Sequence, residues 1–120
     1  MNLLDRTGEL TNKVFDASGV LSINAIGNVM AKLVAVVPGE TLHFYCENFD
    51  NKYYFRWNQY DADGNFVNRQ VNNVSNDFDY TVPVNVCYIW ISYPNVGEVS
   101  VTRVTAYDAI NTKITGGTTA

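Results

Sequence analysis

The sequence has a single histidine and only two cysteines, and this scarcity argues against most catalytic and metal-dependent functions. A zinc site needs several nitrogen or sulfur ligands, and His43 with the separated Cys46 and Cys87 is a poor set. No serine or cysteine near His43 stands in a nucleophile motif. No spacing marks the pair of carboxylic acids that a glycosidase requires across a cleft. We therefore expect no enzymatic activity.

Clustered basic residues and long apolar runs are also missing. The eight Lys and Arg residues are scattered singly, and the net charge is −4. A surface that tracks phosphates needs clustered positive charge, so nucleic acid is an unsuitable partner. Apolar runs such as residues 33–37 are far too short to cross a bilayer, and we expect no membrane insertion. The first ten residues show no basic region followed by an apolar one, which predicts no secretory signal.

Hydrophobic residues make up 47% of the 120 positions, enough for the core of one domain. Strand signals dominate: Leu42, Phe44 and Cys46 alternate with more polar neighbours, a period of two. Short strands separated by turn residues predict an all-β fold, a jelly-roll-like antiparallel sandwich of about nine strands. The expected strands are two within 12–23 around a turn at 16–19, then 29–37, 41–49, 53–60, 65–71, 77–82, 86–93 and 98–107.

We expect residues 1–107 to form the sandwich and residues 108–120 to be a C-terminal tail or linker. Residues 106–114 could add one or two helical turns, which would be marginal alone. Pro38 and Gly39 suit the two central positions of a type II turn between strands.

The acidic stretch Asp61-Ala62-Asp63-Gly64 has two interpretations. It can be the turn of a hairpin, or the start of a calcium loop. An EF-hand would need a glutamate at the twelfth position, which is Asn72, and flanking helices instead of strands. We favour the hairpin turn and expect no cofactor. A loosely bound calcium held by Asp61, Asp63 or Asp77 stays open.

The two cysteines lie in strand-like runs on faces shared with apolar residues. They can be buried free thiols or a bridge between facing strands. Because no export signal is visible, we favour free thiols.

Strand parity separates the aromatic residues of the 53–60 segment into two sets. Phe55 and Trp57 share one parity and are expected to face inward, where the two sheets of a sandwich meet. The other parity is more polar, and in residues 86–93 the less aliphatic parity carries two aromatics. Together these two outer sets predict a carbohydrate-binding platform made of Arg56, Asn58, Tyr60, Tyr88 and Trp90.

A sugar ring offers a patch of C–H groups to an aromatic face, while its hydroxyls need amide, guanidinium or phenol partners. Two alternatives compete with this platform. Both tryptophans can be core residues, since large aromatics are usually well buried. Exposed Trp, Tyr and Arg side chains can instead form a protein–protein interface.

Four segments, in this order, carry a resemblance to a known family: residues 2–5 (NLLD), 35–46 (AVVPGETLHFYC), 55–67 (FRWNQYDADGNFV) and 80–94 (YTVPVNVCYIWISYP). Together they resemble the carbohydrate-binding-module-like β-sandwich domain of minor structural proteins in bacteriophage tails and baseplates. The chain differs from the family pattern at Trp90, where the family usually carries arginine.

The resemblance implies a non-enzymatic virion component, assembled in the cytoplasm of the bacterial host. It implies an accessory domain that contacts host cell-surface polysaccharide and other virion proteins. We expect a homo-oligomer within a larger assembly, because multivalent display raises avidity. The alternative is a purely structural role, as a decoration or fibre protein whose exposed aromatics contact neighbouring proteins.

Overall fold

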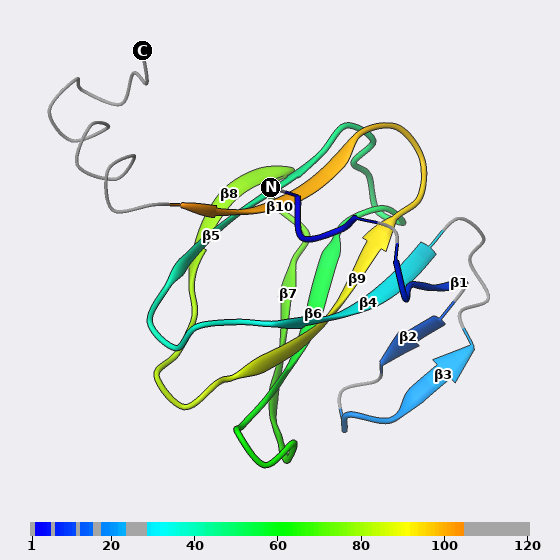
Figure 1. Cartoon of the computed structure of the whole chain (residues 1–120). Helices are drawn as coiled ribbons and strands as arrows, with labels where there is room; N and C mark the ends of the chain where they lie inside the picture. The colour runs from blue at the N-terminus through cyan, green and yellow to red at the C-terminus, as the bar shows by residue number, and fades with distance from the viewer. Residues whose placement is uncertain (1, 6, 12, 16–17, 24–28, 105–120) are drawn as a thin grey trace, which may run out of the picture.

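The computed structural model describes residues 2–5, 7–11, 13–15, 18–23 and 29–104 (Figure 1). The expected helical turns at 106–114 and the tail at 108–120 lie outside these residues. Within the described part, no helix has the length and hydropathy needed to cross a membrane.

Two antiparallel sheets form the sandwich, which confirms the predicted all-β, jelly-roll-like class (Figure 1). The five-stranded sheet has the order β1-β4-β9-β6-β7, and the three-stranded sheet has the order β10-β5-β8. A separate hairpin pairs β2 with β3. The strands are β1 (Leu10–Thr11), β2 (Lys13–Phe15), β3 (Leu21–Ile23), β4 (Val29–Ala35), β5 (Thr41–Cys46), β6 (Phe55–Tyr60), β7 (Phe66–Asn72), β8 (Asp77–Thr81), β9 (Tyr88–Pro94) and β10 (Val99–Val104).

From β4 onward the chain crosses between the sheets at every connection except the β6–β7 hairpin. The first crossing uses the predicted turn: the Glu40 amide donates to the Val37 carbonyl at 3.0 Å. Gly39 has a φ of 85°, which a type II turn requires at its third position. The amide of Gly39 also donates to the carbonyl of Val82 at 2.9 Å, so the β4–β5 turn is hydrogen-bonded to the β8–β9 connection.

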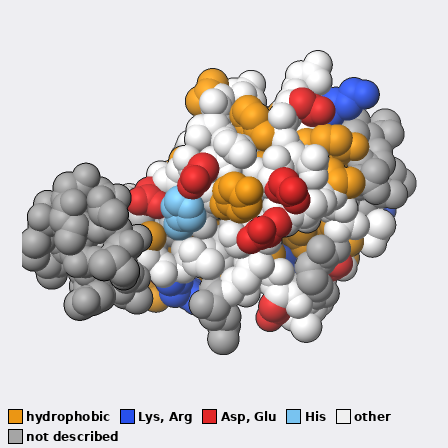
Figure 2. All heavy atoms as spheres, turned by 90° about the horizontal axis from the view of Figure 1, so that it is seen from above, with side chains coloured by type: hydrophobic (Ala, Val, Ile, Leu, Met, Phe, Trp, Pro, Cys, Tyr) orange, Lys and Arg blue, Asp and Glu red, His pale blue; other side chains and the backbone are white. Residues whose placement is uncertain are grey.

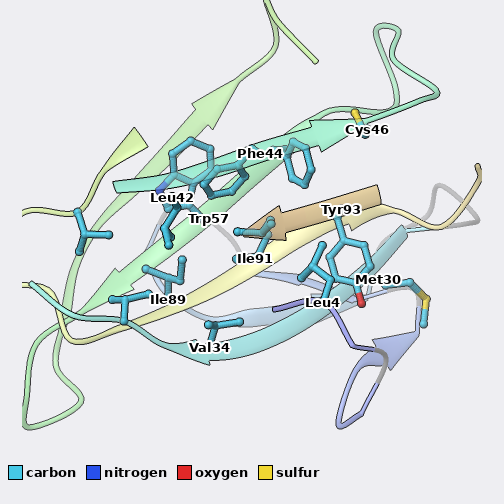
Figure 3. Close-up of a cluster of buried hydrophobic side chains, with 14 of the residues drawn as sticks. Leu4, Met30, Val34, Leu42, Phe44, Cys46, Trp57, Ile89, Ile91 and Tyr93 are labelled. Carbon is cyan, nitrogen blue, oxygen red and sulfur yellow. The ribbon is translucent and has the colours of Figure 1, made fainter. Parts of the chain in front are cut away.

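The core includes Phe44 of β5 and Trp57 of β6, which lie together among buried aliphatic side chains (Figure 3). The ring of Phe44 has its centroid 5.0 Å from Phe55, 4.8 Å from Trp57 and 5.0 Å from Phe78. Such pairs contribute about 0.5–1.5 kcal/mol each beyond the area that they bury. Phe55 and Trp57 therefore face inward, as strand parity predicts. Tyr80 completes the cluster, with its ring 4.9 Å from Trp57.

Both cysteines are free thiols, which confirms that interpretation. Cys46 is fully buried at the end of β5, and Cys87 is half-buried just before β9. Burial raises the pKa of the Cys46 thiol to about 11, because a thiolate is poorly solvated in the core.

The N-terminal residues close one edge of the three-stranded sheet. Asn2 forms a bridge with Thr102, and its side chain bonds the backbone of Val99 and Val101 at 3.1 and 3.0 Å. The chain then turns toward Lys32 of β4, whose ammonium donates to the carboxylate of Asp5. This ion pair ties the N-terminal segment to the five-stranded sheet.

The β2–β3 hairpin covers part of the outer face of the five-stranded sheet. β2 contacts β4 and β9, and the outward-facing Ala31 and Ser92 beneath this region are buried. Gly19, in the turn of the hairpin, reaches the ring of Phe66 on β7: a Cβ there would lie 2.8 Å from it. The candidate site lies farther along the same outer face, where Leu33 and Tyr88 are exposed.

Candidate functional site

A pocket of about 310 Å³ opens on the outer face of the five-stranded sheet. Its lining comes from three strands and one turn. Strand β4 contributes Leu33, β6 contributes Tyr60, and β9 contributes Tyr88 and Trp90. Gly64 of the β6–β7 turn completes it. The lining is thus three aromatic rings, one aliphatic side chain and a backbone surface.

The sheet register brings these residues together. Tyr60 pairs with Tyr88, and Leu33 pairs with Trp90, so they lie in two adjacent rows on one face. Side chains on adjacent strands and the same face lie about 5 Å apart, close enough to border one ligand. A register irregularity at Tyr60 turns the end of β6 toward Phe66, whose ring centroid lies 5.9 Å from that of Tyr60.

The acidic turn contributes Gly64 to the pocket lining and is held by its own hydrogen bonds. Asp61 accepts hydrogen bonds on its carboxylate from the amides of Asp63 and Asn65, at 3.0 and 2.9 Å. These bonds, that from Asn65 first, lower the pKa of the carboxyl group. Gly64 has a φ of 84°, a conformation that glycine adopts without strain. The stretch is a hairpin turn, as favoured from the sequence.

The described residues contain no cluster of three or more side chains able to hold a metal ion. Asp61 is engaged by its own turn, and Asp77 lies on β8 of the other sheet. The fold therefore does not bring Asp61, Asp63 and Asp77 together, and a loosely bound calcium at Asp61, Asp63 or Asp77 stays a prediction.

The structure divides the five residues of the predicted platform. Tyr60, Tyr88 and Trp90 line the pocket, but Arg56 and Asn58 do not. Asn58 has the expected outward parity, yet only 2% of it is exposed, so it offers almost no surface to a ligand. A residue of the right face can still be covered from above, and strand parity does not report this.

Arg56 lies on the same face but stacks its guanidinium over the ring of Tyr54, 4.8 Å from the centroid. The two tryptophans differ as well. Trp57 is a core residue with 3% exposure, whereas Trp90 is half-buried at the pocket. The alternative in which both tryptophans fill the core is therefore wrong for Trp90.

Sequence reasoning missed Leu33 and Gly64 as lining residues. Leu33 stands in an apolar segment where both parities look alike, so only its 45% exposure in the fold reveals an outward position. The sequence predicts Gly64 as a turn residue, but its place in the pocket lining depends on the tertiary position of that turn.

His43 lies on the outer face of the three-stranded sheet, away from the pocket. Its Nδ1 lies 2.6 Å from Asp79 and its Nε2 lies 2.7 Å from Asp77. Figure 2 shows the histidine with acidic side chains gathered near it. Because a carboxylate of β8 lies within hydrogen-bonding distance of each ring nitrogen, His43 links strand β5 to strand β8.

No protein-family model matches the chain, and no curated protein matches it. Among solved structures, it is similar to a chain from the crystal structure of accessory secretory protein 1,2 and 3 in Streptococcus pneumoniae. The identity is 14%, the TM-score is 0.51, and the match covers 88% of this chain and 95% of that one. At this identity the likeness concerns the fold alone.

Proposed function

We propose that the protein is a non-enzymatic carbohydrate-binding domain whose outer-face pocket holds one sugar ring. The observation that carries this proposal is the convergence of Tyr60, Tyr88 and Trp90 around an open pocket of about 310 Å³. That volume lies at the small end of ligand sites, which suits a single ring. Aromatic side chains offer flat apolar surface to the C–H face of a sugar and lose little rotamer entropy on binding.

The place of action follows from the sequence resemblance. A jelly-roll-like sandwich is compatible with the modules of phage tail and baseplate proteins that the four segments resemble. We propose that the domain is an accessory part of a phage virion and contacts host cell-surface polysaccharide. Display in several copies would make a weak single site effective.

A structural role is the second candidate, and the surface around the pocket favours it. Leu33 and Tyr88, which line the pocket, are 45% and 38% exposed. Exposed apolar side chains that lie close together are typical of protein interfaces. In this reading the same pocket receives a side chain of a neighbouring virion protein.

Glycan-array binding of a multivalent form of the protein separates the two functions. We expect the wild type to bind a subset of glycans and Trp90→Ala to lose at least about tenfold in affinity, since one ring supplies much of the stacking surface. Val74→Ala is the control, because Val74 is 84% exposed in the β7–β8 connection. Circular dichroism would verify that both variants fold. Absence of glycan binding, together with Trp90-dependent self-association or virion assembly, would favour the structural role.

A further inference from the structure

Two arginines lie close together on the outer face of the five-stranded sheet, apart from the pocket. In the register of β6 and β7, Asn58 pairs with Arg69 and Arg56 pairs with Val71. Arg56 and Arg69 are therefore diagonal neighbours on one face, with backbones about 7–8 Å apart. Each is half-buried.

Neither arginine has an acidic partner among the described residues. Two other basic residues of the described part each form an ion pair with one carboxylate: Lys32 with Asp5, and Arg103 with Glu40 at 2.9 Å. The Nε atoms of Arg56 and Arg69 are buried and have no hydrogen-bond partner within the part of the chain that the structure describes. A buried N–H without a partner is uncommon in folded proteins.

The electrostatics of the pair are unfavourable in the free protein. Burial lowers the pKa of Arg56 most; the neighbouring Tyr54 raises it, and the positive charge of Arg69 lowers it further. The chain has twelve carboxylates against eight basic residues, so a counter-charge was available in composition. The fold places none beside these two guanidiniums among the described residues.

A planar guanidinium presents paired N–H donors that match the two oxygens of a carboxylate, sulfate or phosphate. Tyr54 fixes one face of Arg56 by stacking, which limits its motion before a ligand arrives. We propose that Arg56 and Arg69 form an oxyanion-binding site on the outer face of the five-stranded sheet. The ligand group is the acidic group of a saccharide, an assignment that rests on the proposed function. The binding of an oxyanion does not depend on that function.

The test follows the Nε–Hε resonances of the arginines by NMR during titration with sodium sulfate, glucuronic acid and glucose. We expect saturable shifts at Arg56 and Arg69 with sulfate and glucuronic acid, and none with glucose. Arg56→Gln and Arg69→Gln should each weaken sulfate binding at least about tenfold, because one of the two forks is lost. Arg103→Gln is the matched control, since Arg103 is already paired with Glu40, and it should bind as the wild type does.

Thermal unfolding in chloride buffer checks for a merely structural pair. An anion site predicts that Arg69→Gln melts at the wild-type temperature or higher, because it removes repulsion from Arg56. A melting temperature several degrees lower, or shifts that do not saturate, would overturn the proposal. Sulfate binding without glucuronic acid binding would assign the site to inorganic or esterified anions and overturn only the acidic-sugar assignment. Loss of glycan binding in Trp90→Ala with intact sulfate binding would leave this site standing by itself.

Discussion

Trp57 and Trp90 lie on opposite faces of one sheet, on the neighbouring strands β6 and β9. Trp57 pairs with Ile91 in the register, while Trp90 pairs with Asn58. One ring packs 4.8 Å from Phe44 in the core, and the other borders the open pocket. The same residue type thus stabilises the sandwich at one position and presents a surface at the other.

Truncating the two tryptophans should separate these roles. Trp57→Ala is expected to lower the free energy of unfolding by about 3–5 kcal/mol, because it opens a cavity among packed rings. Trp90→Ala should cost about 1 kcal/mol or less, because its ring is only half-buried and borders the open pocket. Urea unfolding followed by far-ultraviolet circular dichroism measures both. Equal losses would mean that Trp90 supports the fold as much as Trp57 does.

The alternation of side chains along each strand was enough to predict which rings face inward. Phe55 and Trp57 are in the core and Trp90 is not, because one face of each strand must be buried for two sheets to pack. The strands were predictable from the same alternation. The turns at Gly39 and Gly64 were predictable because turn formation depends on the local sequence. Strand β1 was not foreseen, since two residues carry no periodicity.

Which residues of the outer face are covered could not be predicted from alternation along the strands. Alternation tells which face of the sheet a residue belongs to, but the β2–β3 hairpin docks on that face through contacts far apart in sequence. The burial of Ala31 and Ser92, on the two strands that β2 contacts, therefore depends on tertiary packing that no local pattern reports, and alternation does not report the burial of Asn58 either. The pairing of Arg56 with Arg69 is hidden likewise, because it needs the register of β6 against β7.

Docking of the hairpin can be probed with a matched pair of glycines. Gly19 and Gly39 have φ values of 88° and 85°, so alanine at either position brings the strain of a left-handed residue, about 1–2 kcal/mol. At Gly39 the added Cβ meets nothing within 4 Å, but at Gly19 it lies 2.8 Å from the Phe66 ring. We expect Gly19→Ala to cost about 1 kcal/mol or more beyond Gly39→Ala.

The Gly19→Ala substitution should also weaken glycan binding, because Phe66 packs against Tyr60 of the pocket. Urea unfolding measures the difference in stability between the two variants. Binding to a glycan that the wild type retains measures the loss of affinity. Identical behaviour of the two alanine variants would contradict the docked position of the hairpin turn.

The ion pair between Asp5 and Lys32 predicts a pH-dependent contribution to stability. The hydrogen bond from Lys32, followed by those from Thr7, lowers the pKa of Asp5 below its usual value. A carboxyl group with a lowered folded-state pKa stabilises the protein above its unfolded pKa, near 4, and this stabilisation is lost as the pH falls through the folded value.

Asp5→Asn should therefore lower the urea midpoint at pH 7, and the difference from the wild type should shrink steadily below pH 4. The same substitution in a Lys32→Met background should change the midpoint less and with a weaker pH dependence, since only the bonds from Thr7 remain. A difference that stays constant from pH 7 to pH 2 would show that Asp5 acts through its turn with Thr7 and not through its charge.

The two thiols should differ in reactivity, because Cys46 is fully buried and Cys87 is half-buried. A thiol reagent at pH 8 is expected to modify Cys87 and spare Cys46 in the folded protein, with both modified in urea; mass spectrometry of the peptides assigns each site.

The pKa of Cys46, raised to about 11 from 9.0, adds a second effect. Between those two pH values the unfolded thiol releases a proton that the folded one keeps, so stability falls as the pH rises. Cys46→Val should lack this component of the fall in stability above pH 9. Rapid modification of Cys46 at pH 8, the contrary result for the thiol reagent, would mean that the end of β5 opens far more readily than its packing implies.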